Sequence, residues 1–434
     1  MASLSAAPVT TNGQTTSFGQ SVAALPRARV ITSLLLICGV IQVFSATFIR
    51  SEFATPNASS RIARYMLSTG TYGLNAWHRL KGSDDPSLSS GPLRMFQLPV
   101  EPLYQYVSLR TLPAPLQRYS HIPFVLMFVL GGFLVADTVL GRTRALVAAL
   151  IVALHPFIIV HGPVWDDTTI GAACEWCCLA LLLVATPVRG RSLARCSLLF
   201  GLAAVAALAR AQSQVFLGTV GLLIMAVPRL RIRWREGLAL VTGIALAVAS
   251  WGLRNYYVSG TFLTGTTHDG IGLYESNYPH EHEALLRTGQ TEGLNTLYMQ
   301  GDFSRTAALN EADANRYFIS RGVDAILHRP HGIWFRDSVF KLIASLLGFH
   351  PELRFGAAHN LFQVVPNTLL LVASFFGALC LGRSHRRVPA TFIVALAVMT
   401  ALTLAILLIG PVGFRYQMSM LGIYAITAAS CGKR

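Results

Sequence analysis

Long apolar runs separated by polar segments fill most of this chain. Ten runs stand out, at residues 30–49, 121–140, 145–160, 168–186, 197–208, 215–227, 238–257, 364–381, 388–409 and 418–429. A helix needs ~20 apolar residues to cross the hydrocarbon of a bilayer, and an open strand edge has no backbone partner there. The pattern therefore predicts an all-α polytopic membrane protein with about ten transmembrane helices, the fifth and sixth runs being short for a span.

The basic residues predict how these helices are oriented. If the N-terminus is cytoplasmic, ten helices place sixteen basic residues in the inner segments against one acid, Glu236. These basic residues are Arg27, Arg29, Arg142, Arg144, Arg189, Arg191, Arg195, Arg229, Arg231, Arg233, Arg235, Arg383, Arg386, Arg387, Lys433 and Arg434. Cytoplasmic loops carry such an excess of Lys and Arg. We therefore expect both termini inside the plasma (inner) membrane, with the first helix as an uncleaved anchor.

The acidic residues lie on the opposite side of the predicted membrane. Of the 20 acids, 17 fall on the outer face, most of them in two large extracytoplasmic loops at 50–118 and 255–365. Channels and small permeases usually have short loops, so this distribution favours polar chemistry outside. Within the first loop, Ile62, Met66 and Leu67 fit one face of an interfacial helix that ends near Gly70.

The termini complete the predicted organisation. Residues 1–28 are rich in small and polar residues without an apolar period, which is typical of a disordered cytoplasmic tail. Residues 29–430 form the predicted transmembrane domain.

Composition and charge exclude several classes of protein. Only 13% of the residues are charged and 53% are hydrophobic, whereas a soluble domain carries about 25% charged residues. The net charge of +15 is concentrated in the inner segments, so it reflects topology and we expect no nucleic-acid partner. The seven cysteines avoid the large outer loops, which argues against a disulfide framework. Cys174, Cys177 and Cys178 have metal-like spacing, but their apolar helix favours helix packing.

Acidic residues next to the membrane are the first candidates for chemistry. Glu52 follows the first apolar run closely, where partial desolvation can raise the pKa of a carboxyl group. Asp166 and Asp167 lie in the short outer loop between the third and fourth runs. Such a pair can bind a divalent cation or a cationic donor, or act as acid and base. The alternatives are a solvated loop acid for Glu52 and a helix N-cap for one aspartate.

Two arginines break the positive-inside pattern. Arg210 ends the fifth apolar run, and Arg415 lies in the Gly-Pro-Val-Gly-Phe-Arg-Tyr segment before the last run. An arginine at the membrane boundary is costly without a partner, and its planar fork suits a phosphate group. Snorkelling to lipid headgroups is the alternative.

Two further segments carry polar residues on the predicted outer side. The stretch 251–262 reads Trp-Gly-Leu-Arg-Asn-Tyr-Tyr-Val-Ser-Gly-Thr-Phe and contains Arg254 and Asn255. Its glycines indicate tight turns beside the membrane. The stretch 279–283 alternates His and Glu, which permits a metal site, although its composition favours a solvated polar loop.

The order of these motifs resembles the polytopic GT-C glycosyltransferases, near the dolichyl-phosphate-mannose protein mannosyltransferase and aminoarabinose-transferase branch. The motifs are an acid after the first helix, an R-x-x-R-Y stretch containing Tyr65, an acid in the third–fourth loop, Ala-Arg at 209–210, the Trp-x-x-Arg-Asn segment, and Phe-Arg-Tyr at 414–416. The resemblance extends over residues 29–430. The family usually has two acids or a lone Glu in the first loop, and here Ser51 precedes Glu52.

The resemblance implies a function and a set of roles. It implies a polyprenyl-phosphate sugar donor and a glycan, lipid or protein acceptor on the outer face, with inversion at the anomeric carbon. Glu52 takes the catalytic position, together with Asp166 or Asp167, between which the sequence does not choose. Arg210 and Arg415 match the phosphate-side arginines, whereas the segment of Arg254 and Asn255 is either donor-binding or structural. The resemblance leaves open whether a divalent cation takes part.

Physical chemistry is consistent with these roles, and two other classes remain as alternatives. Glycosyl transfer passes through an oxocarbenium-like state, so a carboxylate must take the acceptor proton while arginines hold the leaving phosphate. A transporter or flippase for a lipid-linked or anionic solute would also use intramembrane arginines, but transporters place polar sites at the midplane of internal repeats. A non-catalytic assembly or receptor protein is the second alternative. It would need the large outer loops but not Glu52 together with Asp166 or Asp167.

Overall fold

The computed structural model describes residues 26–48, 58–74, 93–163, 167–184, 192–278, 300–306, 309–347, 356–383, 388–409 and 417–430. Within these ranges the chain folds into helices and forms no strand, apart from an isolated antiparallel bridge between Leu74 and Leu93. The prediction of an all-α polytopic membrane protein is therefore confirmed.

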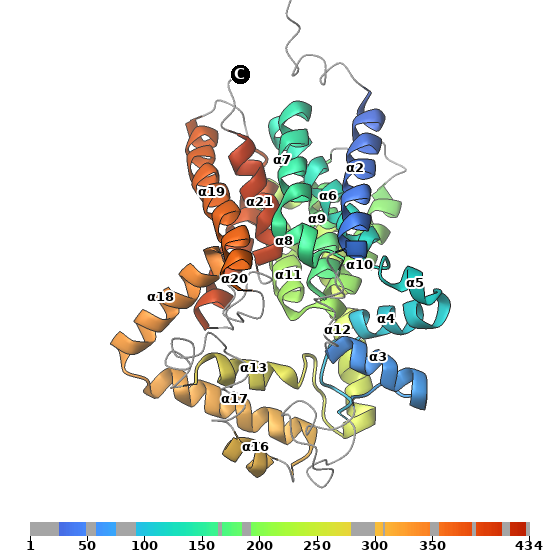
Figure 1. Cartoon of the computed structure of the whole chain (residues 1–434), viewed down its shortest axis with the longest axis vertical. Coiled ribbons are helices and arrows are strands. Elements are labelled where there is room, and N and C mark those ends of the chain that lie inside the picture. Colours follow the sequence, from blue (N-terminus) through green and yellow to red (C-terminus); the bar gives the residue numbers. More distant parts are fainter. Residues whose placement is uncertain are drawn as a thin grey trace, which may run out of the picture.

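The apolar runs form an upright helical bundle (Figure 1). Its members are α2 (Arg27–Phe48), α6 (Ile122–Leu140), α7 (Arg142–Leu154), α8 (Pro156–His161), α9 (Asp167–Leu183), α10 (Ser192–Ala209), α11 (Ala211–Ala226), α12 (Trp234–Ser259), α19 (Gly356–Arg383), α20 (Ala390–Ile409) and α21 (Met418–Ala429). A 3₁₀ turn, η5 (Pro228–Arg233), links α11 to α12.

Five helical segments of the described chain are long and apolar enough to cross a membrane, and three further apolar helices are shorter. The count of ten spans thus stays a prediction. The third run, predicted as one helix over 145–160, is instead divided between α7 and α8. The reason is Pro156, which holds His155 in an extended conformation and cannot donate to the preceding turn.

Glycines let the bundle helices approach closely. A Cβ on Gly131 would lie 2.8 Å from the backbone carbon of Trp176, so α6 and α9 touch at their backbones. A Cβ on Gly377 would lie 1.8 Å from the carbonyl oxygen of Thr427, so α19 and α21 do the same. Small residues commonly provide such contacts between helices in lipid, where burial of apolar side chains gives little net gain. Van der Waals packing at these contacts therefore holds the bundle together.

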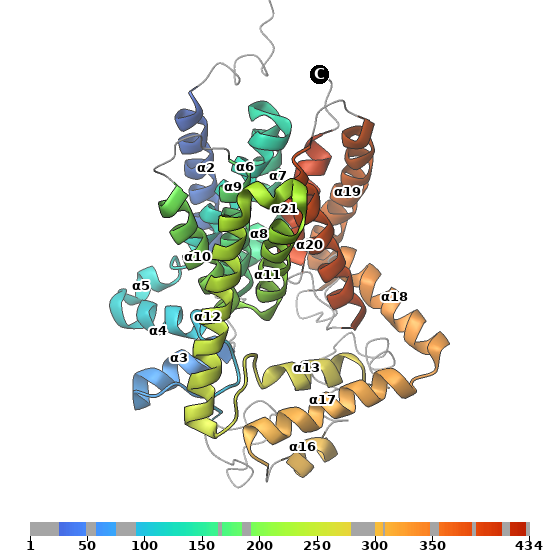
Figure 2. The ribbon, with the colours of Figure 1, turned by 180° about the vertical axis from the view of Figure 1, so that it is seen from behind.

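The two ends of the bundle differ in character. The start of α2 and the end of α21 lie at one end, and Arg27 of α2 pairs there with Asp137 of α6 at 2.8 Å (Figures 1 and 2). The helices of both large polar loops gather at the opposite end, as the sequence predicted. They are α3 (Ala58–Thr69), α4 (Val100–Thr111), α5 (Ala114–Gln117), α13 (His268–Ser276), α16 (Gln300–Thr306), α17 (Glu311–His328) and α18 (His331–Leu347).

These seven helices of the two large loops, called the outer helices below, have a hydrophobic core of their own. It is separate from the core of the bundle. It joins buried side chains of α3, α13, α16 and α17, among them Ile62, Tyr274 and Phe318. The helix predicted near 61–70 is present as α3, and Gly70 with a φ of 72° ends it. The prediction that Ile62, Met66 and Leu67 share one membrane-facing side of this helix was wrong. Ile62 is buried in the core of the outer helices and Met66 packs against that core, whereas Leu67 is exposed. The bilayer is not needed to cover that face.

The half-buried carboxylate of Glu311 connects the outer helices to one another. Glu311, the first residue of α17, accepts hydrogen bonds from the backbone N–H groups of Arg94 at 2.7 Å and Met95 at 3.0 Å. It also accepts from the hydroxyl of Thr267, which precedes α13, at 2.5 Å. Burial raises the pKa of Glu311, and these hydrogen bonds and the Arg254 guanidinium oppose the shift. Glu311 thus connects the first large loop to the second.

Candidate functional site

The site is built around Arg210, the single residue between α10 and α11. Its backbone is extended, with φ −147° and ψ 136°, so the helix breaks there and the chain reverses at once. The reversal lies toward the outer helices, and both α9 and α10 contact α4 (Figure 2). Its side chain is only 9% exposed and lies inside the bundle rather than at the lipid surface. This position does not fit the snorkelling alternative, because a snorkelling side chain ends in water or headgroups.

Asp167 is the acid that the fold brings to Arg210. It is the first residue of α9, and its Oδ2 lies 3.9 Å from the Nε of Arg210. A carboxylate in the first turn of a helix is stabilised by the helix dipole. Asp167 remains about a third exposed, whereas the arginine is desolvated. The guanidinium of Arg210 thus lies in the interior of the bundle, and the carboxylate of Asp167 lies on its more exposed side.

Glu175 is a member of this region that the sequence analysis missed. It lies two turns into α9 and is 2% exposed. Its Oε1 accepts from the hydroxyl of Ser213 on α11 at 2.6 Å, and its Oε2 accepts from the hydroxyl of Ser419 on α21. Arg210 lies within electrostatic reach of the same carboxylate. The signal in the sequence was a lone acid within an apolar run, which is costly and therefore meaningful in a membrane segment.

The contacts of Glu175 join three helices of the bundle beside the Arg210 site. Three helices, α9, α11 and α21, meet at this carboxylate, and Trp176 beside it donates from its indole N–H to the carbonyl oxygen of Ser419 at 2.9 Å. Gly171 lies one turn after Asp167, and the stem of Arg210 packs directly over it. The arginine is thus held by close packing below and by Asp167 at its open side.

The segment 251–262 folds back along the outer end of α12. The indole of Trp251 donates to the carbonyl oxygen of Gly265 at 3.2 Å, and the amide of Asn255 donates to that of Leu263 at 2.7 Å. Gly260, with a φ of 71°, ends the helix and allows the turn. The ring of Phe262 lies against Gly252, where a Cβ would be 2.6 Å away.

Arg254 links this turn to the first outer loop. Its guanidinium donates to the carbonyl oxygen of Arg94 at 2.6 Å and lies 5.0 Å and 4.9 Å from the ring centres of Tyr72 and Trp251. It also donates to the side-chain oxygen of Asn255 at 3.0 Å. These contacts favour the structural alternative for Arg254 and Asn255, because both side chains are engaged within the chain.

Tyr65 lies on α3, away from the Arg210 pair. Its ring packs over Gly73, where a Cβ would lie 3.0 Å from the ring carbon Cε1. Its backbone carbonyl accepts from Ser68 at 3.0 Å and from Thr69 at 2.8 Å. A substrate role for Tyr65 stays a prediction.

Three predicted site residues lie outside the described part of the chain. They are Glu52, Asp166 and Arg415. The His–Glu alternation at 279–283 also lies outside it. The geometry therefore brings together Asp167 and Arg210 and adds Glu175 and Ser213 to them.

The described residues do not compose a metal site by themselves. No group of three or more His, Cys, Asp or Glu side chains in the described ranges is arranged to hold an ion. Asp167 has Arg210 as its charged neighbour, and Glu175 already accepts two hydroxyls. Cys174 and Cys178 are buried in α9, and Cys177 lies 3.7 Å from the carbonyl oxygen of Met127, in agreement with helix packing.

Comparison with known proteins gave no match by sequence and a weak likeness to solved structures. No family model matches the chain, and no curated protein matches it. Among solved structures, the chain is similar to the archaeal oligosaccharyltransferase AglB from Archaeoglobus fulgidus, described in complex with an inhibitory peptide and a dolichol-phosphate. The identity is 12% and the TM-score 0.43, over 92% of this chain and 50% of that one. The chain thus spans about half the length of AglB, and at this similarity the function of AglB is not transferred to it.

The arrangement can perform one kind of chemistry particularly well. A desolvated guanidinium at the polar end of a membrane bundle is suited to an anion, because its hydrogen bonds are strong where water is excluded. The neighbouring carboxylate is partly exposed and can face a second, polar reactant. A substrate that reaches the site from the bilayer could place an anionic group against Arg210 and a reactive polar centre near Asp167.

Proposed function

We propose that the protein is a membrane glycosyltransferase that moves a sugar from a polyprenyl-phosphate donor to an acceptor on the extracytoplasmic face. The observation that carries the proposal is the buried Arg210 at the outer end of the bundle, with Asp167 3.9 Å away. The motif order in the sequence supports the same function. The acceptor is a hydroxyl or amine of a glycan, lipid or protein.

Arg210 has the first role, binding the phosphate of the donor. Its planar fork can donate two parallel hydrogen bonds to phosphate oxygens, a geometry that lysine does not offer. Arg415 is assigned to the same group from the sequence. Because the bundle itself is apolar, the polyprenyl chain lies in lipid alongside it while its phosphate reaches the outer end.

The reaction forms one bond and breaks one bond at the anomeric carbon. The acceptor heteroatom attacks this carbon from the face opposite the phosphate, so the configuration inverts. The bond to the phosphate oxygen breaks, and its electron pair leaves with polyprenyl phosphate, whose charge Arg210 stabilises. A carboxylate takes the acceptor proton, a role that we assign to Glu52.

Asp167 has the supporting role in this scheme. Its carboxylate lies at the open side of Arg210 and can stabilise positive charge on the sugar as the phosphate departs. We assign this role to Asp167 because its carboxylate lies 3.9 Å from Arg210, whereas Asp166 lies outside the described residues. The charged pair of Arg210 and Asp167 lies at the end of the bundle, where α9 begins and α10 ends, and this position favours the glycosyltransferase over a transporter with its site at the midplane.

The test is transfer by purified full-length protein in detergent. Radiolabelled polyprenyl-phosphate sugars are supplied with acceptor extracts, and free polyprenyl phosphate is measured. The expected result is release of polyprenyl phosphate that depends on Arg210, with Arg210→Lys weakening donor affinity by about tenfold or more because the fork is lost. The matched control is Arg316→Lys, on the exposed surface of α17, which should transfer like the parent.

The same protein in sealed vesicles separates the enzyme from the transporter. A glycosyltransferase releases polyprenyl phosphate in detergent, where no gradient or second compartment exists. A flippase moves the intact labelled lipid between leaflets and releases none. Transbilayer movement of an uncleaved donor, without any release in detergent, would overturn the proposal.

A further inference from the structure

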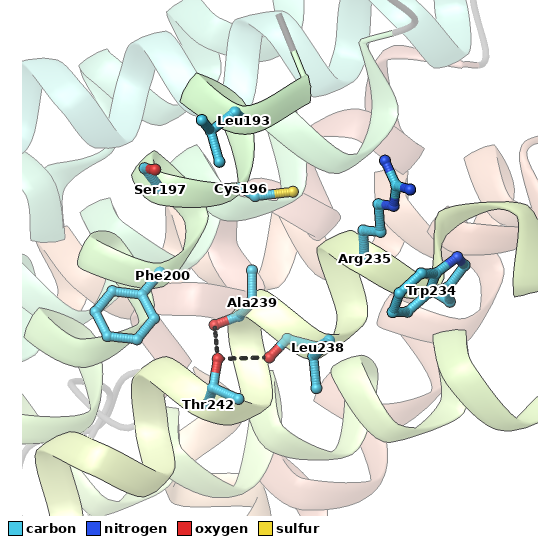
Figure 3. A pocket seen from close by; sticks show the side chains of 9 residues that line it. All are labelled: Leu193, Cys196, Ser197, Phe200, Trp234, Arg235, Leu238, Ala239 and Thr242. Carbon is cyan, nitrogen blue, oxygen red and sulfur yellow. Dashed lines mark hydrogen bonds between the residues drawn. The ribbon is translucent and has the colours of Figure 1, made fainter.

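A hollow lies between α10 and α12, apart from the Arg210 site. It measures about 610 Å³, within the range of pockets that hold a small ligand. Figure 3 shows its lining, which comes from two helices. The lining residues are Leu193, Cys196, Ser197, Phe200, Trp234, Arg235, Leu238, Ala239 and Thr242.

The packing of the two helices creates the hollow. A Cβ on Gly243 would lie 2.5 Å from the carbonyl oxygen of Phe200, so α10 and α12 touch there at their backbones. From this contact the hollow runs toward the N-terminal ends of both helices, between small side chains such as Ser197 and Ala239. The result is a groove that opens where the helices begin.

The wall of the groove is suited to hydrocarbon. Leu193, Phe200 and Leu238 present exposed apolar side chains. The hydroxyl of Thr242 donates to the carbonyl oxygens of Leu238 at 2.8 Å and Ala239 at 3.3 Å (Figure 3). Its hydrogen is therefore already bonded within the helix and needs no acceptor on a ligand. An acyl chain therefore meets few polar groups along this wall.

The mouth of the groove is positively charged. Arg235 lines it, with its guanidinium 5.5 Å from the ring centre of the exposed Trp234. Arg195 pairs with Glu236 at 3.8 Å, and Arg233 lies close enough to Arg195 that the pKa of Arg233 is lowered by burial and by that charge. Arg195 and Arg233 thus lie beside the same acid, Glu236, which follows Arg235 in the chain.

One of these arginines has unused hydrogen-bonding capacity. The Nη1 atom of Arg233 is buried and has no hydrogen-bond acceptor in the described part of the chain. Buried donors are normally satisfied, and a phosphate oxygen satisfies an arginine particularly well. An apolar groove with Arg235 in its lining, and with the Arg233 donor two residues away in the chain, matches a lipid with an anionic headgroup.

We propose that this groove is a binding site for an anionic glycerophospholipid. One acyl chain lies between α10 and α12, and the phosphate lies against Arg235 and Arg233. Basic pockets between helices at the cytoplasmic surface are typical sites for acidic lipid headgroups. With the N-terminus inside, the ligand comes from the cytoplasmic leaflet. The site is separate from that of the proposed glycosyl transfer, because Phe200, the lining residue of α10 nearest to Arg210 in the chain, is ten residues or ~15 Å of helix away from it.

The test measures lipid retained by the full-length protein. Protein in detergent is mixed with phosphatidylglycerol or phosphatidylcholine, and bound lipid is counted by native mass spectrometry over a concentration series. We expect tighter binding of phosphatidylglycerol. Arg235→Gln should weaken it about fivefold, the usual contribution of one basic residue at an anionic membrane surface. Ser197→Trp, which fills the groove without changing charge, should remove it.

Two matched variants serve as controls. Arg29→Gln removes a basic residue at the same end of the bundle, and Ala194→Trp adds an indole on the exposed surface of α10 outside the groove. Both should bind phosphatidylglycerol like the parent. Equal retention of the two lipids, or unchanged binding by Arg235→Gln and Ser197→Trp, would overturn the proposal. Displacement of phosphatidylglycerol by an equal concentration of polyprenyl phosphate would also overturn it, in favour of a donor-lipid groove.

Discussion

Gly171→Ala adds one methyl group directly beneath the proposed phosphate ligand. The new Cβ would lie 3.0 Å from Cδ and 3.3 Å from Cγ of Arg210, and 3.2 Å from the hydroxyl of Ser213. Ordinary van der Waals contact begins at 3.4 Å, so the arginine stem must move by about 0.4 Å. The stem is flexible and can move without disturbing the helices, but its guanidinium moves with it.

The expected effect on turnover follows from this displacement. A 1 Å misplacement of a catalytic group can cost about a hundredfold, so ~0.4 Å corresponds to roughly three- to tenfold slower transfer. The free energy of unfolding should change by less than about 2 kcal/mol. Alanine gains roughly 0.5–1 kcal/mol over glycine within a helix, and overpacking costs about 1–3 kcal/mol.

The assay compares transfer and stability in the same preparations. Turnover with a radiolabelled polyprenyl-phosphate sugar is measured beside thermal unfolding in detergent. Gly132→Ala is the control, because no atom lies within 4 Å of its new Cβ, and it should transfer at the parental rate. Parental turnover and donor affinity in Gly171→Ala would refute the idea that the position of Arg210 limits the reaction.

Four further predictions test other parts of the molecule. Glu52→Gln should lower turnover by ~10²–10⁴-fold with donor binding unchanged, as measured by kinetics and donor titration, if Glu52 is the general base. A reporter that requires the cytoplasm should be active when fused after Arg434, and activity of a reporter that requires the outer side would contradict the N-in, C-in topology. Glu311→Ala should lower the melting temperature of the outer helices, because two backbone N–H groups and one hydroxyl lose their acceptor, at roughly 0.5–1.5 kcal/mol for each hydrogen bond. Because the folded-state pKa of Glu311 is raised above 4.5, protonation favours the folded state, so the melting-temperature advantage of the parent over Glu311→Gln should narrow as pH rises above 4.5 and level off once folded Glu311 is ionised.

The fold class was predictable because it depends on hydrophobicity averaged over segments of about 20 residues, which the sequence gives directly. Runs such as 30–49 and 238–257 are long and apolar enough to cross a membrane, and α2 and α12 match them closely. The break at His155 was also accessible, because Pro156 interrupts the run 145–160. The length of the run alone indicates one helix, whereas the stereochemistry of Pro156 divides it into two.

The site was predictable only in part, because its contacts join residues that are distant in the chain. Arg210 and Asp167 could be selected individually, since both are charged residues at membrane boundaries. Glu175 could not be assigned partners, because Ser419 is 244 positions away and serine is unremarkable in an apolar helix. The outer core was missed for a related reason. Ile62 has the same amphipathic pattern whether it faces lipid or Phe318.

The position of Ser419 has a consequence for how the protein is assembled during synthesis. The Glu175 carboxylate enters the membrane with α9, and Ser213 reaches it when α11 follows. Its second hydroxyl, and the acceptor for the Trp176 indole, arrive only with the final helix, α21. Nascent chains that end before residue 418 therefore carry a half-satisfied carboxyl group in the membrane. Quality-control proteases that recognise exposed polar groups within lipid would have a means to distinguish such truncated chains from the finished protein.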